Sequence, residues 1–241
     1  MLKKLRVADL NVEIDLKYDR TIRQSKDYEA DFDGYNINVN IPDEEYAILK
    51  EETPYLSDED VEYIYTGAAF YEALLHFNGF MLHSSGVVVD DYAYLFSADP
   101  GTGKSTHTGL WVKYFGEDKA KIINDDKPAI RMIDDKLYVY GTPWSGKTDQ
   151  NINMRVPLGA IVFLERSDEN WVKKIEPAEA IPLILQQTIR PQEQEIMIKL
   201  LDMLDVVLRR VNLYRLGCNM SREAVEVSYN NIKAEDYKYE N

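Results

Sequence analysis

The sequence predicts an α/β protein with a mixed β-sheet core flanked by helices and a small β-rich appendage at its N-terminus. Three observations carry this prediction. Residues 92–97 form an apolar run of strand length, which leads through a glycine-containing loop into a segment with helical apolar spacing. Residues 158–164 are continuously apolar, which is typical of a buried central strand. Residues 1 to about 50 alternate loosely between apolar and polar, as short strands with one buried face do.

The N-terminal part is expected to contain two short strands, residues 10–14 and 35–39, with a turn at Asp33-Gly34. A helix then begins after Ser57, whose hydroxyl can cap it, and ends at Asn78-Gly79. Its apolar positions recur at helical spacing, which favours packing against a core over any chemical role.

The first chemical motif follows residues 86–89 and 92–97, which we expect to form two apolar strands paired as a hairpin around Asp90-Asp91. A Walker A match indicates a phosphate-binding loop when it lies between a strand and a helix, as we expect here. Ala98 occupies the position where the first glycine of the motif usually lies. The glycines let backbone N–H groups surround phosphate oxygens, Lys104 adds a full positive charge, and the Ser105 hydroxyl can ligate Mg²⁺. The expected nucleotide-binding residues are Asp99, Pro100, Gly101, Thr102, Gly103, Lys104, Ser105 and Thr106.

A pair of carboxylates forms the second motif. A strand over residues 121–124 ends in Asp125 and Asp126, about twenty residues after the glycine loop. If this strand runs parallel to the loop strand, both present their carboxyl ends at the edge where ligands of α/β sheets bind. One aspartate could then hold Mg²⁺ while the other takes a proton from an acceptor hydroxyl. An ordinary Asp-Asp turn is the alternative interpretation.

Next comes a predicted hairpin of residues 129–133 and 137–140, which delivers a second Walker A match at residues 141–148. We reject this match as the nucleotide loop, because Pro143 lacks an N–H, Trp144 is bulky, and no amphipathic helix follows. The loop is polar and carries Lys147, so it is interpreted as an active-site loop that covers the substrate or the transferring phosphate. A plain surface turn is the alternative.

The remaining chain supplies further core elements. Residues 171–175 are expected to pair with the strand of residues 158–164 across the turn at 167–170. Helices follow at residues 177 to about 188 and 192 to about 209, then a strand at 213–216 and a final helix after Ser221.

Charge and composition exclude several classes of function. The net charge of −14 argues against nucleic-acid and anionic membrane partners, which both select basic surfaces. The single cysteine, Cys218, excludes an internal disulfide framework. The N-terminus shows no sustained apolar run of the signal-peptide kind, and no segment is long and apolar enough to span a bilayer. We therefore expect a soluble cytoplasmic protein; a monomer and a homo-oligomer both remain open.

The segment from about residue 80 to about 166 resembles the HPr kinase/phosphorylase family, which is related in fold to the phosphoenolpyruvate carboxykinases. The resemblance rests on His83 with residues 86–89, on residues 97–105, and on residues 124–126 followed by a hairpin. Residues 155–161 look like an altered form of the family's Arg-Gly-Leu-Gly-Ile signature, and Asn153 stands where the family places an acidic residue. The resemblance implies a P-loop kinase-like domain over residues 57–241, with residues 1–56 as an appendage packed on it.

The resemblance also implies an ATP-dependent kinase that moves the γ-phosphoryl group to a serine hydroxyl of a protein or peptide. By matching position, Asp125 would act as base and Asp126 would help with metal or water. His83 would sit beside this pair, while Lys104 and Ser105 would bind the phosphates and Mg²⁺. Two alternatives stay open: a small-metabolite phosphotransferase of carboxykinase-like fold, and a non-catalytic nucleotide-binding regulatory protein.

Overall fold

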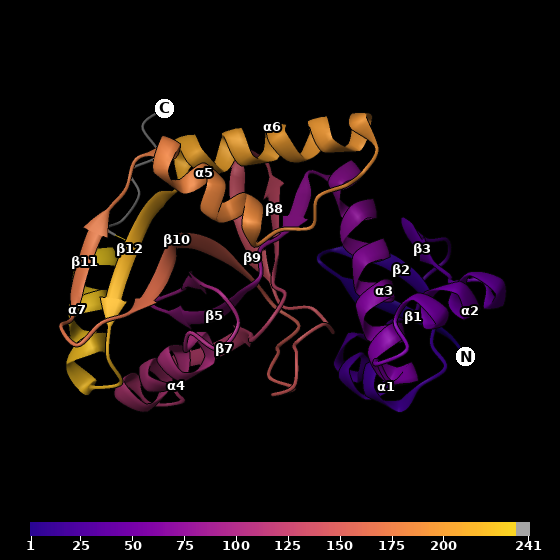
Figure 1. The fold of residues 1–241 in the computed structure, drawn as a ribbon, viewed down its shortest axis with the longest axis horizontal. Coiled ribbons are helices and arrows are strands. Elements are labelled where there is room, and N and C mark those ends of the chain that lie inside the picture. The colour runs from indigo at the N-terminus through magenta and orange to yellow at the C-terminus, as the bar shows by residue number, and fades with distance from the viewer. Residues whose placement is uncertain (235–241) are drawn as a thin grey trace.

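The computed structural model describes residues 1–234 and shows a mixed α/β architecture in which a curled mixed sheet is flanked by helices (Figure 1). The large sheet has nine strands in the order β4-β8-β9-β10-β6-β5-β7, with β12 beside β10 and β11 beside β12. In chain order these strands are β4 (Gly79–Met81), β5 (Ser84–Val89), β6 (Tyr92–Ser97), β7 (Ala120–Asn124), β8 (Ala129–Ile133), β9 (Lys136–Tyr140), β10 (Arg155–Arg166), β11 (Trp171–Lys174) and β12 (Asn212–Cys218).

Strand β10 is the central strand of this sheet and pairs with three others. Its first residues, Arg155 to Pro157, pair antiparallel with β9, and the rest runs parallel to β6 on one side and to β12 on the other. Because β5 is antiparallel to both β6 and β7, β7 runs in the same direction as β6. The expected hairpin of β5 and β6 is therefore confirmed, and β7 meets the condition that it runs parallel to β6.

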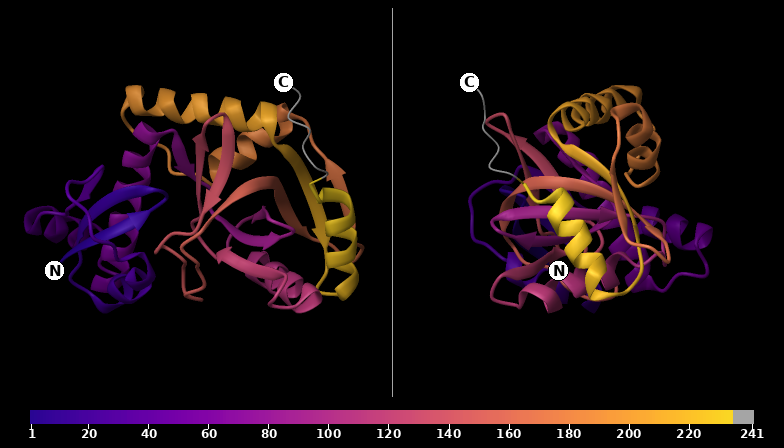
Figure 2. Two further views of the ribbon diagram at one scale, coloured as in Figure 1. Left: turned by 180° about the vertical axis from the view of Figure 1, so that it is seen from behind. Right: turned by 90° about the vertical axis from the view of Figure 1, so that its left-hand side faces the viewer.

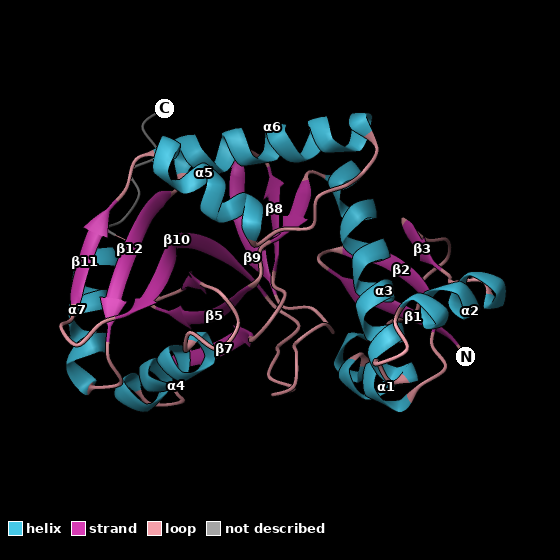
Figure 3. Ribbon diagram, in the orientation of Figure 1, coloured by secondary structure: helices cyan, strands magenta, loops and turns pink. Residues whose placement is uncertain are grey.

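Helices cover both faces of the sheet (Figure 3). One face carries α5 (Pro177–Gln186) and α6 (Gln194–Arg210), and the other carries α4 (Lys104–Phe115) and α7 (Arg222–Ile232). The side chains of β10 alternate between the two faces of the sheet. Ile161 and Phe163 pack in the core under α5 and α6, whereas Val162 packs in the core under α4 and α7. This two-sided burial explains why the segment reads as continuously apolar.

The N-terminal part lies at one end of the molecule (Figures 1 and 2). Its three-stranded sheet orders β1 (Leu2–Val7), β2 (Leu10–Asp15) and β3 (Ile37–Val39), with the helices α1 (Asp19–Gln24) and α2 (Asp43–Glu52) beside it. The long helix α3 (Asp58–Leu74), continued by a 3₁₀ turn, Leu75–Phe77, packs between this sheet and the large one. Ser57 caps α3 by accepting a hydrogen bond of 3.1 Å from the Asp60 N–H, as expected.

Some elements differ from the sequence expectation. Strand β11 pairs with β12 and not with β10, because β12 lies between them and pairs in parallel with β10. The strand expected at residues 35–39 is shorter, and β1, α1 and α2 were not anticipated. Helix α2 buries no residue, so it lacks the apolar periodicity by which a helix is recognised. The tail after Ala234 lies outside the described residues.

Candidate active site at the carboxyl edge of the sheet

Strands that are far apart in the sequence end at one edge of the sheet. Strands β6, β7, β10 and β12 point their carboxyl ends to this edge, and β5, which runs antiparallel, begins there. The edge therefore collects His83 before β5, the loop after β6, the Asp125-Asp126 pair after β7 and Arg166 at the end of β10. Open α/β sheets bind ligands at this kind of edge.

The loop between β6 and α4, residues 98–103 and hereafter the β6–α4 loop, has a backbone that requires glycine at two positions. Gly101 has φ +78° and Gly103 has φ +126°, and Gly103 is the N-cap residue of α4. An added Cβ would meet nothing within 4 Å at either position, so backbone conformation and not crowding selects glycine here. The N-terminus of α4 adds partial positive charge, which makes the loop suited to an anion.

Lys104 is the first residue of α4, and its side chain folds back over the loop. Its Nζ donates a hydrogen bond of 2.8 Å to the Ala98 carbonyl, and the residue is only 8% exposed. Burial lowers the pKa of Lys104, whereas the negative charges of Asp126, Asp125 and Asp99 oppose that shift. The negative charges of these three carboxylates thus favour the protonated form of the lysine. Ser105 and Thr106, in the same first turn, are exposed.

Asp125 is held in place by two hydroxyl groups. The Ser85 hydroxyl donates to its Oδ1 at 2.5 Å, and the Thr148 hydroxyl donates to its Oδ2 at 2.7 Å. Ser85 also shares a hydrogen bond of 2.7 Å with Thr108 of α4. The chain Asp125–Ser85–Thr108 therefore ties the carboxylate to the helix that carries Lys104.

Asp126 has a more strongly charged environment. Its Oδ1 lies 3.2 Å from His83 Nε2, and its Oδ2 lies 3.3 Å from Lys127 Nζ and accepts a hydrogen bond of 2.9 Å from the Tyr63 hydroxyl. Burial opposes its ionisation, but the hydrogen bond from His83 and the charge of Lys127 outweigh burial and hold the pKa of Asp126 well below its usual range. The structure thus brings His83 into direct contact with one member of the aspartate pair.

A polar chain continues from His83 to the β6–α4 loop. The His83 Nδ1 lies 3.0 Å from the Gln187 Oε1, and the Gln187 amide donates a hydrogen bond of 3.1 Å to Asp99 Oδ1. Gln187 immediately follows α5, and no sequence motif marks this segment. Since an amide can bridge a carboxylate and an imidazole, Gln187 links Asp99, His83 and Asp126 in one network.

The N-terminal part also reaches the site, through Tyr63 of α3. The Tyr63 hydroxyl accepts a hydrogen bond of 2.8 Å from the Gly146 N–H while it donates to Asp126. The Arg20 guanidinium stacks 3.8 Å from the centre of the Tyr63 ring and donates to the Gly146 carbonyl at 3.2 Å. Burial and the charge of Asp126 raise the pKa of Tyr63 well above its usual range, so the phenol stays protonated. No sequence motif contains Tyr63, so its hydrogen bond to Asp126 was not anticipated.

The second Walker A match, residues 141–148, forms an irregular loop with no helix after it. Its Trp144 is fully buried and stacks 4.8 Å from Phe70, so the bulky residue anchors the loop on α3. Gly141 is needed because a Cβ there would lie 1.9 Å from the Ile152 carbonyl oxygen. Lys147 is exposed, and the loop contacts Asp125 through Thr148. A covering role for Lys147 remains a prediction.

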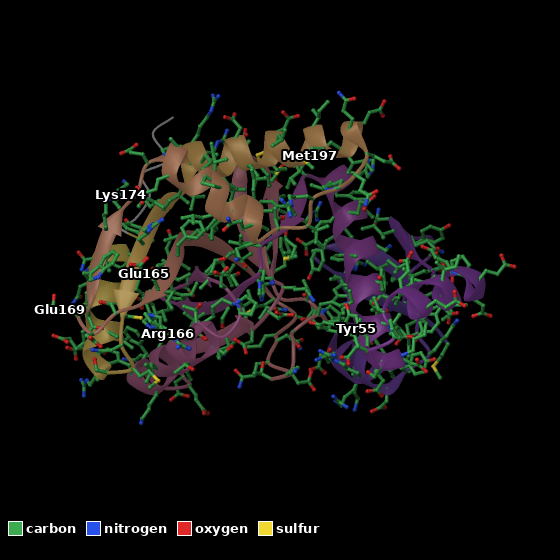
Figure 4. The ribbon with its side chains drawn as sticks, in the orientation of Figure 1. Tyr55, Glu165, Arg166, Glu169, Lys174 and Met197 are labelled. Atoms are coloured by element: carbon green, nitrogen blue, oxygen red, sulfur yellow. The ribbon has the colours of Figure 1, made fainter. Side chains whose placement is uncertain are left out.

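Two pockets flank the β6–α4 loop, and Arg166 lies between them. One, of about 530 Å³, is lined by residues including Asp99, Leu183 and Gln187. The other, of about 600 Å³, is lined by α4 and the β12–α7 connection. Arg166, labelled in Figure 4, lines both and donates to the carbonyls of Gly101 at 2.5 Å and Thr102 at 3.3 Å. A lone arginine at a strand end carries no sequence motif, so this contact was not anticipated.

A metal at this site would need ligands beyond the protein. Among residues 1–234, no group of three or more His, Cys, Asp or Glu side chains is arranged to hold a metal ion. Mg²⁺ typically binds one or two carboxylates together with substrate phosphates and water. The oxygen donors here, the Ser105 hydroxyl and the Asp126 carboxylate, are of the type that Mg²⁺ selects.

Comparisons with known proteins give a structural similarity and no match by family model or by sequence to a curated protein. A solved structure of the Hpr(Ser) kinase/phosphatase from Coxiella burnetii is similar to the chain, with a TM-score of 0.30 and 13% sequence identity over 54% of this chain and 90% of that one. Within residues 1–234, no helix combines the length and apolarity that crossing a membrane requires.

Proposed function

We propose that this protein is an ATP-dependent kinase that transfers the γ-phosphoryl group to a serine hydroxyl of a protein or peptide. One observation carries the proposal: the glycine loop with Lys104 lies at the same sheet edge as the Asp125-Asp126 pair and His83. Phosphoryl transfer depends on positioning and charge stabilisation, and it needs a phosphate cradle beside a group that orients the nucleophile. The motif resemblance to HPr kinases supports serine as the acceptor.

The two aspartates are assigned different roles by their surroundings. Asp126 faces Lys127 and His83 and has a strongly lowered pKa, which makes it a poor proton acceptor and a good anion for organising cations. Asp125 accepts hydrogen bonds from the neutral hydroxyls of Ser85 and Thr148. We therefore assign the proton-accepting role to Asp125 and the electrostatic role to Asp126.

In the proposed reaction the serine oxygen forms a bond to the γ-phosphorus while the bond from that phosphorus to the β–γ bridging oxygen breaks. The serine proton passes to Asp125, and ADP leaves with the bridging oxygen. Lys104 and the N–H groups of the β6–α4 loop bind the phosphates and neutralise their charge. Ser105 and Asp126 would hold Mg²⁺, which would offset the charge on the β- and γ-phosphates.

The replacement Asp125→Asn tests this assignment. We expect transfer from γ-labelled ATP to an array of serine peptides to fall by about 100-fold or more. The dissociation constant of Mg-ATP should change by less than about threefold, because the loop and Lys104 remain intact. Asp134→Asn, in the hairpin turn of β8 and β9 where φ is +47°, is the matched control, since asparagine tolerates this conformation.

The same assay separates the alternatives. Transfer to small hydroxylated metabolites and to no peptide would contradict the peptide acceptor and favour a metabolite phosphotransferase. ATP binding without transfer to any acceptor by the intact protein would contradict both enzymatic functions and leave a nucleotide-binding regulatory protein.

A further inference from the structure

We propose that the nucleoside half of the bound nucleotide lies in the pocket between α4 and the β12–α7 connection, hereafter the α4 pocket. This inference rests on the proposed nucleotide site. The pocket has a volume of about 600 Å³, and its lining includes Thr106, His107, Leu110, Leu164, Asn219 and Met220. The pocket on the other side of the loop, lined by Leu183 and Gln187, is the competing site.

The direction of a triphosphate along the loop selects between them. In a glycine loop of this kind the lysine reaches the β- and γ-phosphates, and the backbone N–H groups at the start of the helix hold the α- and β-phosphates. Asp125 is hydrogen-bonded to Ser85, which is hydrogen-bonded to Thr108 one helical turn after Lys104, so the γ end belongs on the side of the aspartates. The α-phosphate end then lies toward the first turns of α4, where Thr106 and Leu110 open into the α4 pocket.

The competing pocket is better placed for the acceptor. It shares Gln186 and Gln187 with a smaller pocket, of about 360 Å³, that His83, Asp126 and Lys127 line. Gln187 is hydrogen-bonded to His83 and to Asp99, so this side of the loop is continuous with the aspartate and histidine groups. A group that must meet the γ-phosphorus approaches from there, which leaves the α4 pocket for the base and ribose.

The chemistry of the α4 pocket suits a nucleobase. Leu110, Leu164 and Met220 supply apolar surface, and Met220 is 77% exposed, so a flat ligand could cover it. Polar groups stand at its edge, among them Asn219, whose side chain donates to the Asp168 carbonyl at 2.9 Å and accepts from the Ser221 N–H at 2.9 Å. Small-molecule sites combine apolar walls with a few fixed polar groups in this way.

His107 forms part of the inner wall and stays neutral. It is 2% exposed, accepts a hydrogen bond of 3.1 Å from the Trp111 indole N–H, and has a pKa that burial lowers to about 4. The inner wall beneath the proposed base therefore adds no positive charge to the pocket at neutral pH.

Calorimetry with two probes, Mg-ATP and Mg-tripolyphosphate, tests the inference, since only ATP carries a nucleoside. For Leu110→Gln and Met220→Gln we expect the dissociation constant of ATP to rise about five- to tenfold and that of tripolyphosphate to change less than about twofold. Leu183→Gln, the matched change in the competing pocket, should leave both constants within about twofold. Met220 is exposed, so its variant should fold even where Leu110→Gln does not.

The outcomes distinguish this inference from the function on which it rests. Loss of ATP affinity in Leu183→Gln but in neither α4-pocket variant would move the nucleoside to the competing pocket and overturn the inference. Equal binding of ATP and tripolyphosphate by the intact protein would overturn it too, while the phosphate loop would stand. Binding of neither probe would overturn the proposed function itself.

Discussion

At the scale of single residues, the site works through groups whose neighbours fix their charge. Asp126 is held ionised by His83 and Lys127, while Tyr63 is held protonated and donates to it. His107, on the other side of the β6–α4 loop, is held neutral by burial. Each state follows from the balance between desolvation and nearby charge.

His107 gives a pH dependence whose sign can be stated. Its pKa is about 4 in the folded chain against an ordinary value of 6.5, so the unfolded chain binds a proton first as the pH falls. The stability that the neutral imidazole provides is complete above pH 6.5 and is lost as the pH falls toward 4, by about 3 kcal/mol in total. Urea unfolding of the intact protein and of His107→Gln, measured across this range, should show the loss only in the intact protein.

Glutamine is the suitable replacement because its amide oxygen can still accept from Trp111 and does not titrate. The lowered pKa of Asp126 acts in a separate window, below its ordinary value of 3.8, so it does not obscure the test. An identical pH profile in both proteins would show that folding does not shift the pKa of His107.

At the scale of elements, the turn from β6 into α4 determines the shape of the proposed phosphate-binding loop. Gly101 and Gly103 take positive φ angles that ordinary side chains rarely adopt. For Gly103→Ala we expect the free energy of unfolding to fall by about 1–3 kcal/mol and nucleotide binding to weaken, since the loop must distort. Thermal unfolding and calorimetry measure both effects.

Gly109→Ala is the matched control in the same helix. A Cβ at Gly109 meets nothing within 4 Å, and alanine is favoured over glycine in a helix interior by about 1 kcal/mol. This variant should be as stable as the intact protein or more so. If Gly103→Ala behaved like Gly109→Ala, the loop would not need its left-handed backbone.

The residues of this part of the candidate site can be singled out from the sequence because they lie in local motifs. The glycine pattern, Lys104 and the strand before them are contiguous, and the aspartates directly follow a strand, β7, whose direction comes from its antiparallel pairing with β5. Tyr63, Gln187 and Arg166 could not be predicted, because they come from other elements and meet the site only through tertiary packing. The position of β12 between β10 and β11 was missed for the same reason, since parallel pairing leaves no local turn signal.

At the scale of the whole molecule, the N-terminal part and the sheet edge are joined at the second loop. Arg20 and Gln24 of α1 both donate to the Gly146 carbonyl, at 3.2 Å and 3.0 Å, and Tyr28 donates to Asn151 at 2.8 Å. Through Tyr63 the same region contacts Asp126. The N-terminal part thus supports the loop that contacts Asp125 through Thr148.

This arrangement predicts a positioning role for Tyr63. In Tyr63→Phe the ring and its stacking with Arg20 remain, but the hydrogen bonds to Asp126 and from Gly146 are lost. We expect kcat to fall about tenfold with little change in KM for ATP, because one charge-assisted hydrogen bond contributes about 1.5–3 kcal/mol. Steady-state kinetics checks this. Tyr46→Phe, which removes an exposed hydroxyl contact to Asp58, is the control, and an equal fall there would contradict the role.

Lys104 and its loop, and not Lys147 and its loop, are proposed to bind the nucleotide. Calorimetry of Mg-ATP binding to the intact protein, to Lys104→Ala and to Lys147→Ala tests it most directly, with each titration repeated without Mg²⁺. We expect Mg²⁺-dependent binding that weakens by about 100-fold or more in Lys104→Ala, which removes a buried charge from the phosphates, and by much less in Lys147→Ala, which is exposed. Binding that survives Lys104→Ala and is abolished by Lys147→Ala, or no binding by the intact protein, would contradict the claim.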